Sequence, residues 1–261
     1  MAILSGEPRG IGQVLDTGFR LYFKSIRKVF LLAVLAILVG EAPMFWMLAW
    51  VRGVNPRSRP ELLAQLPAGF FVLLVVAGLS GLLLYGAVLV RMHNIGRDAP
   101  ARLGDALGRS FRALAWLVIA TILTGLVVDV GLVLLLVPGI IFLVSLQFAN
   151  YAILLERKGP LGGMNYSHKV VWGNWWRTAG VLAVIAIILL AVWYGLGLLL
   201  SLGLTAAAPG GLKWLSTAVW VVLYSLILPL GTALKLALYE DLKLRKEGID
   251  LEARIGDAAT A

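Results

Sequence analysis

Cysteine is absent from this 261-residue chain, and histidine occurs only twice, as His93 and His168. Without cysteine there is no disulfide, no thiol nucleophile, no iron–sulfur cluster and no cysteine-ligated zinc. The two histidines show no HExxH-type spacing, so a histidine-based metal site would need carboxylates from distant parts of the chain. We therefore expect no metal and no cofactor, and we predict that the protein is not an enzyme.

Charged residues are also scarce. They make up 14% of the chain, whereas hydrophobic residues make up 60%, and the mean hydropathy is +0.91. Soluble domains are nearer to about 45–50% apolar and about 25% charged. The apolar residues fall in runs of about 20, the length that a helix needs to cross a hydrocarbon core about 30 Å thick. Because a backbone in lipid must satisfy its own hydrogen bonds, these runs predict membrane-spanning helices.

We predict an all-α, polytopic membrane protein that forms a single transmembrane domain over residues 1–261. Pro138-Gly139 is a signal for a hairpin or helix break between the third and fourth apolar runs. Together these two runs cover about 65 Å of helix at about 1.5 Å per residue, which is enough for two crossings. The predicted spans are about 29–51, 69–90, 113–137, 139–155, 178–204 and 212–238.

The distribution of positive charge orients these spans. Of the 23 lysines and arginines, all but Arg52, Arg57, Arg59 and Lys213 fall on the side of the N-terminus. Loops rich in lysine and arginine stay in the cytoplasm, so we expect both termini on the cytoplasmic side of the membrane. The net charge of +9 lies at the ends of apolar runs, where it meets anionic lipid, and does not predict nucleic-acid binding.

Each odd-numbered span is preceded by a short amphipathic stretch, at about 11–28, 99–112 and 160–176. A helical period with a basic polar face is typical of helices that lie in the membrane interface. The stretches begin alike, with Ile11-Gly12, Leu103-Gly104 and Leu161-Gly162. We therefore predict three like-oriented units, each an interfacial helix followed by a transmembrane hairpin. The tail, 240–261, is expected to continue the last span as a charged cytoplasmic helix that Gly248 could end.

Four polar residues inside the apolar runs are candidates for binding a ligand or ion. Glu41 and Asp129 are carboxylates, which are costly in lipid and usually face a bundle interior or water. The alternative is that each lies near the outer interface. Gln147 and Asn150, spaced i, i+3, share one helix face, where they either hydrogen-bond to other helices or contact a ligand.

A second set of candidates lies at the predicted cytoplasmic interface. Tryptophan suits this boundary because its ring is apolar and its N–H is polar. These residues could anchor the protein or bind lipid head groups. The interface candidates are Arg20, Lys24, Arg27, Lys28, Arg109, Arg112, Trp175, Trp176 and Arg177.

Several motifs resemble a known family. They are Leu136-Val137-Pro138-Gly139-Ile140-Ile141, Leu154-Leu155-Glu156, Gly159-Pro160, Ser167, Gly173-Asn174-Trp175-Trp176-Arg177 and Leu238-Tyr239-Glu240-Asp241-Leu242-Lys243. They resemble the YciC-like family and also the membrane domain attached to some glycerophosphodiester phosphodiesterases. The resemblance implies a six-span bacterial inner-membrane protein. The family's usual Ala-Leu after Gly-Pro is here Gly163-Met164, and no soluble phosphodiesterase domain is present, so that activity is not implied.

These observations leave three functions open. The first is a non-enzymatic protein that handles lipid or another amphiphile, as a transporter-like or membrane-homeostasis factor. The second is a scaffold or anchor that recruits protein partners through its cytoplasmic loops and tail. The third, a membrane-embedded enzyme, would need clustered acids or histidines, which the pattern does not predict. Membrane lipids are the expected partners, and a homo-oligomer is compatible with the sequence.

Overall fold

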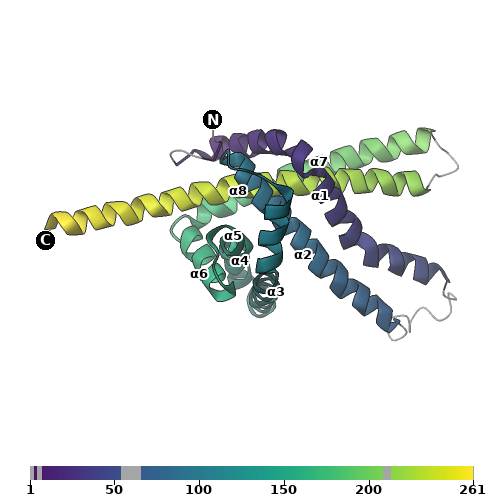
Figure 1. Ribbon diagram of the computed structural model, residues 1–261, viewed down its shortest axis with the longest axis horizontal. Coiled ribbons are helices and arrows are strands. Elements are labelled where there is room, and N and C mark those ends of the chain that lie inside the picture. The colour runs from purple at the N-terminus through teal and green to yellow at the C-terminus, as the bar shows by residue number, and fades with distance from the viewer. Residues whose placement is uncertain (1–2, 5–7, 54–65, 208–212, 261) are drawn as a thin grey trace.

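The computed structural model describes residues 3–4, 8–53, 66–207 and 213–260, and in these ranges the chain is all-α, without a strand (Figure 1). The long helices follow from long apolar runs that contain few glycines and prolines. The helices are α1 Ile11–Gly53, α2 Ala68–Gly96, α3 Leu103–Leu134, α4 Leu136–Ser145, α5 Ala149–Glu156, α6 Pro160–Val171, α7 Trp175–Ala207 and α8 Lys213–Thr260.

Six helical stretches of the described residues are long and apolar enough to cross a membrane, and each overlaps one of the predicted spans. They are Ile11–Leu48, Ala68–Gly96, Leu103–Leu134, Leu136–Glu156, Trp175–Gly203 and Ala218–Gly248. The chain is thus a multi-pass membrane protein. Whether its helix pairs form three like-oriented transmembrane hairpins stays a prediction.

The boundaries of several elements differ from the expected ones. The predicted interfacial stretches 11–28 and 99–112 are not separate helices, because α1 and α3 run through them without a break. Only α6 stands alone, and it ends before Gly173, whose φ of 95° lies in the left-handed region that glycine readily adopts. α8 also continues through Gly248, since one glycine costs a helix only about 1 kcal/mol relative to alanine.

The break between the third and fourth apolar runs lies at Leu135 and not at Pro138-Gly139. Leu135 is extended, with φ −152° and ψ 115°, and Pro138 lies in the first turn of α4, where its missing N–H is tolerated. A Cβ atom on Gly131 would lie 2.9 Å from the Cα atom of Gly139. The two glycines therefore let α3 and α4 approach closely beside the turn.

The fourth predicted span consists of two helices, α4 and α5, separated by a turn at 146–148. Ser167 of α6 bridges this break. Its hydroxyl donates to the carbonyl of Ser145 at 2.7 Å and accepts from the N–H of Phe148 at 3.1 Å. Because buried backbone groups need partners, Ser167 stabilises the interruption and holds α6 against it.

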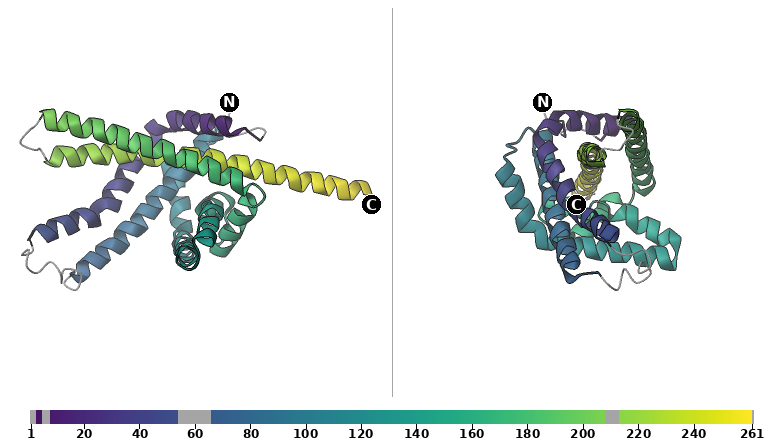
Figure 2. Two further views of the ribbon diagram at one scale, coloured as in Figure 1. Left: turned by 180° about the vertical axis from the view of Figure 1, so that it is seen from behind. Right: turned by 90° about the vertical axis from the view of Figure 1, so that its right-hand side faces the viewer.

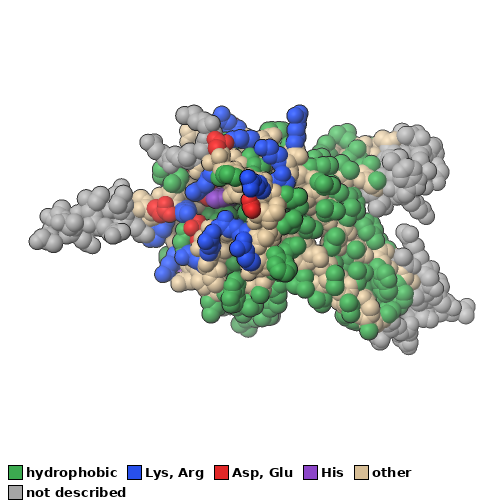
Figure 3. All heavy atoms as spheres, viewed as in Figure 1, with side chains coloured by type: hydrophobic (Ala, Val, Ile, Leu, Met, Phe, Trp, Pro, Cys, Tyr) green, Lys and Arg blue, Asp and Glu red, His purple; other side chains and the backbone are tan. Residues whose placement is uncertain are grey.

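α8 is the central helix. In the most apolar 18-residue stretch of its span, 61% of the residues are buried, whereas 17% are buried in the corresponding stretches of α3 and α7. Figure 1 shows α8 lying across the picture while α3 is seen nearly end-on, and the quarter-turned view in Figure 2 reverses this. The α3–α6 region thus lies across the direction of α7 and α8. In Figure 3, charged side chains gather on one half of the visible face and apolar side chains on the other.

Candidate functional site

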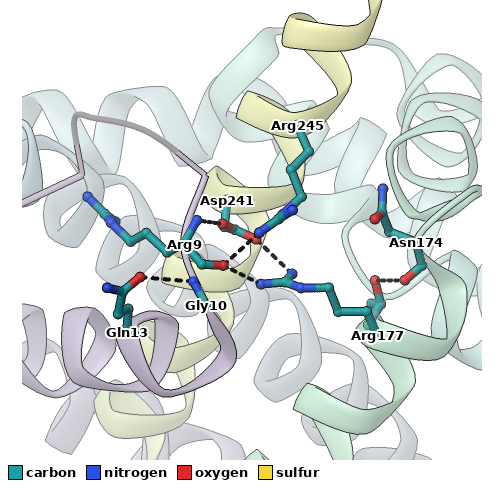
Figure 4. Close-up of polar contacts among 8 residues, drawn as sticks. Arg9, Gly10, Gln13, Asn174, Arg177, Asp241 and Arg245 are labelled. Atoms are coloured by element: carbon teal, nitrogen blue, oxygen red, sulfur yellow. Dashed lines mark hydrogen bonds and ion pairs between the residues drawn. The ribbon is translucent and has the colours of Figure 1, made fainter.

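A buried carboxylate at the charged end joins three separate parts of the chain. Asp241 of α8 is fully buried, and it accepts hydrogen bonds from Arg177 Nη1 at 2.7 Å, Arg245 Nε at 3.0 Å and the N–H of Arg9 at 2.6 Å (Figure 4). The carbonyl of Arg9 accepts from the other ends of the same two guanidinium groups, each at 2.7 Å. The N-terminal segment, α7 and α8 are therefore tied together around one carboxylate.

Neighbouring residues of α8 make two more such ties. Glu240, also buried, lies 2.7 Å from Arg97 Nη2 and 3.2 Å from His93 Nε2, which fixes α8 to the end of α2. Lys243 donates to Glu156 at the end of α5 at 2.7 Å. We call Glu240, Asp241, Lys243 and these partners the ionic hub.

The ionic hub was not predicted from the sequence, which placed Glu240 and Asp241 at the start of a charged cytoplasmic helix that continues the last span. One signal could have found it. Leu238 and Leu242, spaced i, i+4, continue an apolar stripe past the two acids, and both are fully buried in the structure. An apolar stripe that continues around charges indicates a packed helix and not a solvated one.

Beside the ionic hub lies a groove with a volume of about 530 Å³, between α2, α3 and α5. From α3 it is lined by Asp105, Arg109, Arg112, Ala113 and Trp116. Their spacing of i, i+4, i+7, i+8 and i+11 places them on one face of the helix. We call this the basic groove.

The opposite wall of the basic groove comes from α5 and the residues that follow it. Ile153 and Leu154 supply buried apolar surface, and Arg157 and Lys158 add two cations at the end of the helix. Arg157 has φ 56°, a left-handed conformation that is uncommon for residues other than glycine. The groove is thus polar at one end and apolar along its depth.

The four cations of the basic groove form no ion pair with a described carboxylate. Arg109 donates to the carbonyl of Leu155 at 3.2 Å and Arg112 to that of Gly108 at 3.1 Å. In the described parts of the chain, no carboxylate forms an ion pair with Arg109, Arg112, Arg157 or Lys158. Asp105 is the one acid in the lining that the structure describes.

Two groups outside the spans have shifted pKa values. A hydrogen bond from Lys24 holds the pKa of Asp98 below its ordinary value. The same hydrogen bond ties α1 to the segment before α3. Burial, and then the nearby charge of Glu156, raise the pKa of Tyr166 to about 12. Tyr166 is therefore neutral at physiological pH, and Lys158, 4.6 Å from its ring centroid, meets a π face and not an anion.

The interface candidates separate into four environments. Arg109 and Arg112 line the basic groove, whereas Arg177 turns into the ionic hub. Trp175 and Trp176 line an apolar groove of about 620 Å³ beside α4. On the exposed side of α1, Arg20 lies 3.8 Å from Asp16, Lys24 pairs with Asp98, and Arg27 and Lys28 are exposed.

The four polar candidates inside the spans do not come together in a described site. Glu41 is half-buried in α1, and Asp129 is exposed on α3. Asn150 donates to Thr121 Oγ1 at 3.2 Å, and its buried Oδ1 has no partner among the described residues. Gln147 lies in the turn between α4 and α5. Within the described ranges, no three His, Asp or Glu side chains lie close enough to hold a metal ion.

The comparisons with known proteins agree with this architecture. Residues 40–228 match the model of the uncharacterised protein family UPF0259. The chain belongs to this family. It is 28% identical over 144 residues to a UPF0259 membrane protein of Pectobacterium carotovorum, covering 53% of this chain and 56% of that protein. It is 30% identical over 100 residues to one of Sodalis glossinidius, covering 38% and 40%.

The chain thus spans about half the length of the curated relatives that it matches. No solved structure matches it. The family match agrees with the resemblance to bacterial membrane proteins of the YciC-like type. The comparisons give no support to the second resemblance, to the membrane domain of glycerophosphodiester phosphodiesterases.

Proposed function

We propose that this protein is a non-enzymatic inner-membrane protein that handles lipid or another amphiphile at the cytoplasmic leaflet. The basic groove carries the proposal. It combines cations at one end with an apolar wall of Ile153, Leu154 and Trp116, which are the two kinds of surface that an amphiphile needs.

The position of the basic groove supports the same function. Its four cations place it at the charged end of the molecule, and the other half of the face drawn in Figure 3 is largely apolar. Trp116, 49% exposed, is of the residue type that prefers the level of the lipid head groups. A lipid in the surrounding leaflet could therefore enter the groove sideways, without crossing the apolar core of the protein.

The assignment as a non-enzymatic protein rests on how the buried acids are used. Glu240 and Asp241 are both held in ion pairs with arginine. Their ion-pair partners lie in α2, at its C-terminal end and in α7, except Arg245, which lies one turn further along α8. Carboxylates held in this way stabilise the arrangement of helices. Among the described lining residues of the groove, Asp105 is the one carboxylate, and no histidine or second acid lies beside it in the lining for general acid–base chemistry on a bound lipid.

The charged end is assigned to the cytoplasm because lysine- and arginine-rich segments are retained there. Reporter fusions test this orientation. A reporter that is active only outside the cytoplasm should be active after Arg59 and inactive after Ala261. Activity of the C-terminal fusion would contradict the orientation, and with it the assignment of the groove to the cytoplasmic leaflet.

Native mass spectrometry of the detergent-extracted protein tests the proposed function itself. We expect lipid or another amphiphile to remain bound in a defined stoichiometry after mild delipidation. A protein that emerges free of any bound amphiphile would contradict lipid handling. The alternative, a scaffold that recruits protein partners, would then be the better account.

A further inference from the structure

We propose that the basic groove binds the phosphate of an anionic phospholipid. This inference rests on the proposed function and names its ligand: a phosphate group held between α3 and the end of α5, with the acyl chains on the apolar side of the groove. A lipid head group and a free phosphate ion both carry this group, and the groove favours the lipid.

The charge of the groove calls for an anion. Four cations, Arg109, Arg112, Arg157 and Lys158, line one space with the single carboxylate of Asp105 among the described lining residues. Glu156, the nearby acid, is already bound to Lys243 at 2.7 Å. Four cations beside one carboxylate repel one another, and a bound anion reduces that repulsion.

The hydrogen-bonding capacity of Arg109 points the same way. Its Nη2 donates to the carbonyl of Leu155 at 3.2 Å, which holds the guanidinium group between α3 and α5. Its Nε is buried and has no acceptor among the described residues. Buried donors are normally satisfied, and guanidinium groups suit phosphate because their N–H donors lie in one plane and bind two oxygens at once.

The apolar part of the groove distinguishes a lipid from a free phosphate ion. Trp116 is one turn beyond Arg112 on the same face of α3, and Ile153 and Leu154 lie across from it. A soluble phosphate ion would leave the exposed ring of Trp116 without an apolar contact. Basic sites between membrane helices on the cytoplasmic side are suited to anionic head groups, whereas the trimethylammonium of phosphatidylcholine would add a fifth cation.

The test compares lipid retention by native mass spectrometry after titrating delipidated protein with phosphatidylglycerol or with phosphatidylcholine of the same chain length. Two variants remove one groove cation each, Arg109→Gln and Arg157→Gly. Arg157 has φ 56°, which glycine adopts more readily, so its variant removes charge without straining the fold. Arg102→Gln is the matched control, because Arg102 is exposed just before α3 and does not line the groove.

We expect wild type and Arg102→Gln to retain phosphatidylglycerol in preference to phosphatidylcholine. Each groove variant should retain about fivefold less, the loss expected for one cation near a lipid surface, with an unchanged melting temperature for Arg157→Gly. Retention of both lipids alike would overturn the preference for an anionic lipid, and no effect of either variant would overturn the phosphate site. Both results would leave lipid handling intact.

Two further outcomes identify the source of the phosphate and the fate of the broader proposal. Displacement of phosphatidylglycerol by equimolar inorganic phosphate would keep the phosphate site but overturn a lipid as its source. Failure to retain any lipid would contradict the proposed function as well. Raised salt should weaken retention in wild type, because exposed charges are screened within about 8 Å at physiological ionic strength.

Discussion

Replacing Asp241 by asparagine should destabilise the protein more than any change at an exposed acid. The substitution keeps the size of the side chain but removes the charge that faces Arg177 and Arg245, whose side chains are only 19% and 27% exposed. Removing one partner of a buried ion pair costs about 3–5 kcal/mol. Both guanidinium groups keep the carbonyl of Arg9 as an acceptor, so we expect the lower end, about 3 kcal/mol.

The matched control is Glu247→Gln on the same helix. Glu247 is 59% exposed in its pair with Lys243, at 3.8 Å, and exposed i, i+4 pairs contribute only about 0.3–0.5 kcal/mol. Both variants would be unfolded by titration with sodium dodecyl sulfate in mixed micelles, followed by far-ultraviolet circular dichroism. Equal stability of the two variants would refute the conclusion that the ionic hub holds the helices together.

Three further substitutions test the packing and the polar candidates. Gly18→Ala places a Cβ atom 2.8 Å from the Cα of Leu234 and should lower the free energy of unfolding by about 1–3 kcal/mol. Gly12→Ala is the control, because its Cβ atom would meet no atom within 4 Å. Equal effects of the two variants would exclude a close α1–α8 crossing. Ser167→Ala leaves the buried N–H of Phe148 unpaired and should lower the free energy of unfolding by about 1–3 kcal/mol in the same titration. An unchanged free energy of unfolding would show that other contacts stabilise the break between α4 and α5. Glu41→Gln should change the free energy of unfolding by less than about 0.5 kcal/mol, because Glu41 forms no hydrogen bond or ion pair with the described residues; a larger loss would show a structural role.

The number of spans could be predicted from the sequence because it depends on local composition. A run of about 20 apolar residues requires a helix in lipid, whatever the helix packs against. The break between α3 and α4 was harder, because Pro138 is compatible with both a break and the first turn of a helix. The turn at Leu135 lies beside the close contact of Gly131 with Gly139. Local sequence rules do not predict such a contact between two helices.

The candidate site was predictable only in part. The face of α3 that carries Arg109 and Arg112 follows from helical periodicity. Arg157 and Lys158 join it only because α5 packs against α3. Periodicity cannot predict such a contact, since Arg109 and Leu155, for example, are 46 residues apart. For the same reason the sequence predicted Arg177 as an interface residue that anchors the protein or binds a lipid head group, and did not predict its pairing with Asp241.

Photo-crosslinking in the native membrane tests the central claim, that the basic groove binds a lipid, most directly. A phosphatidylglycerol analogue with a diazirine beside its glycerol would be activated in membranes that contain the protein, and the adducts would be mapped by peptide mass spectrometry. We predict adducts concentrated in the peptides that carry Trp116 and Ile153, and competition by unlabelled phosphatidylglycerol. Adducts spread evenly over exposed apolar positions such as Ile187 and Leu190 of α7 would contradict it.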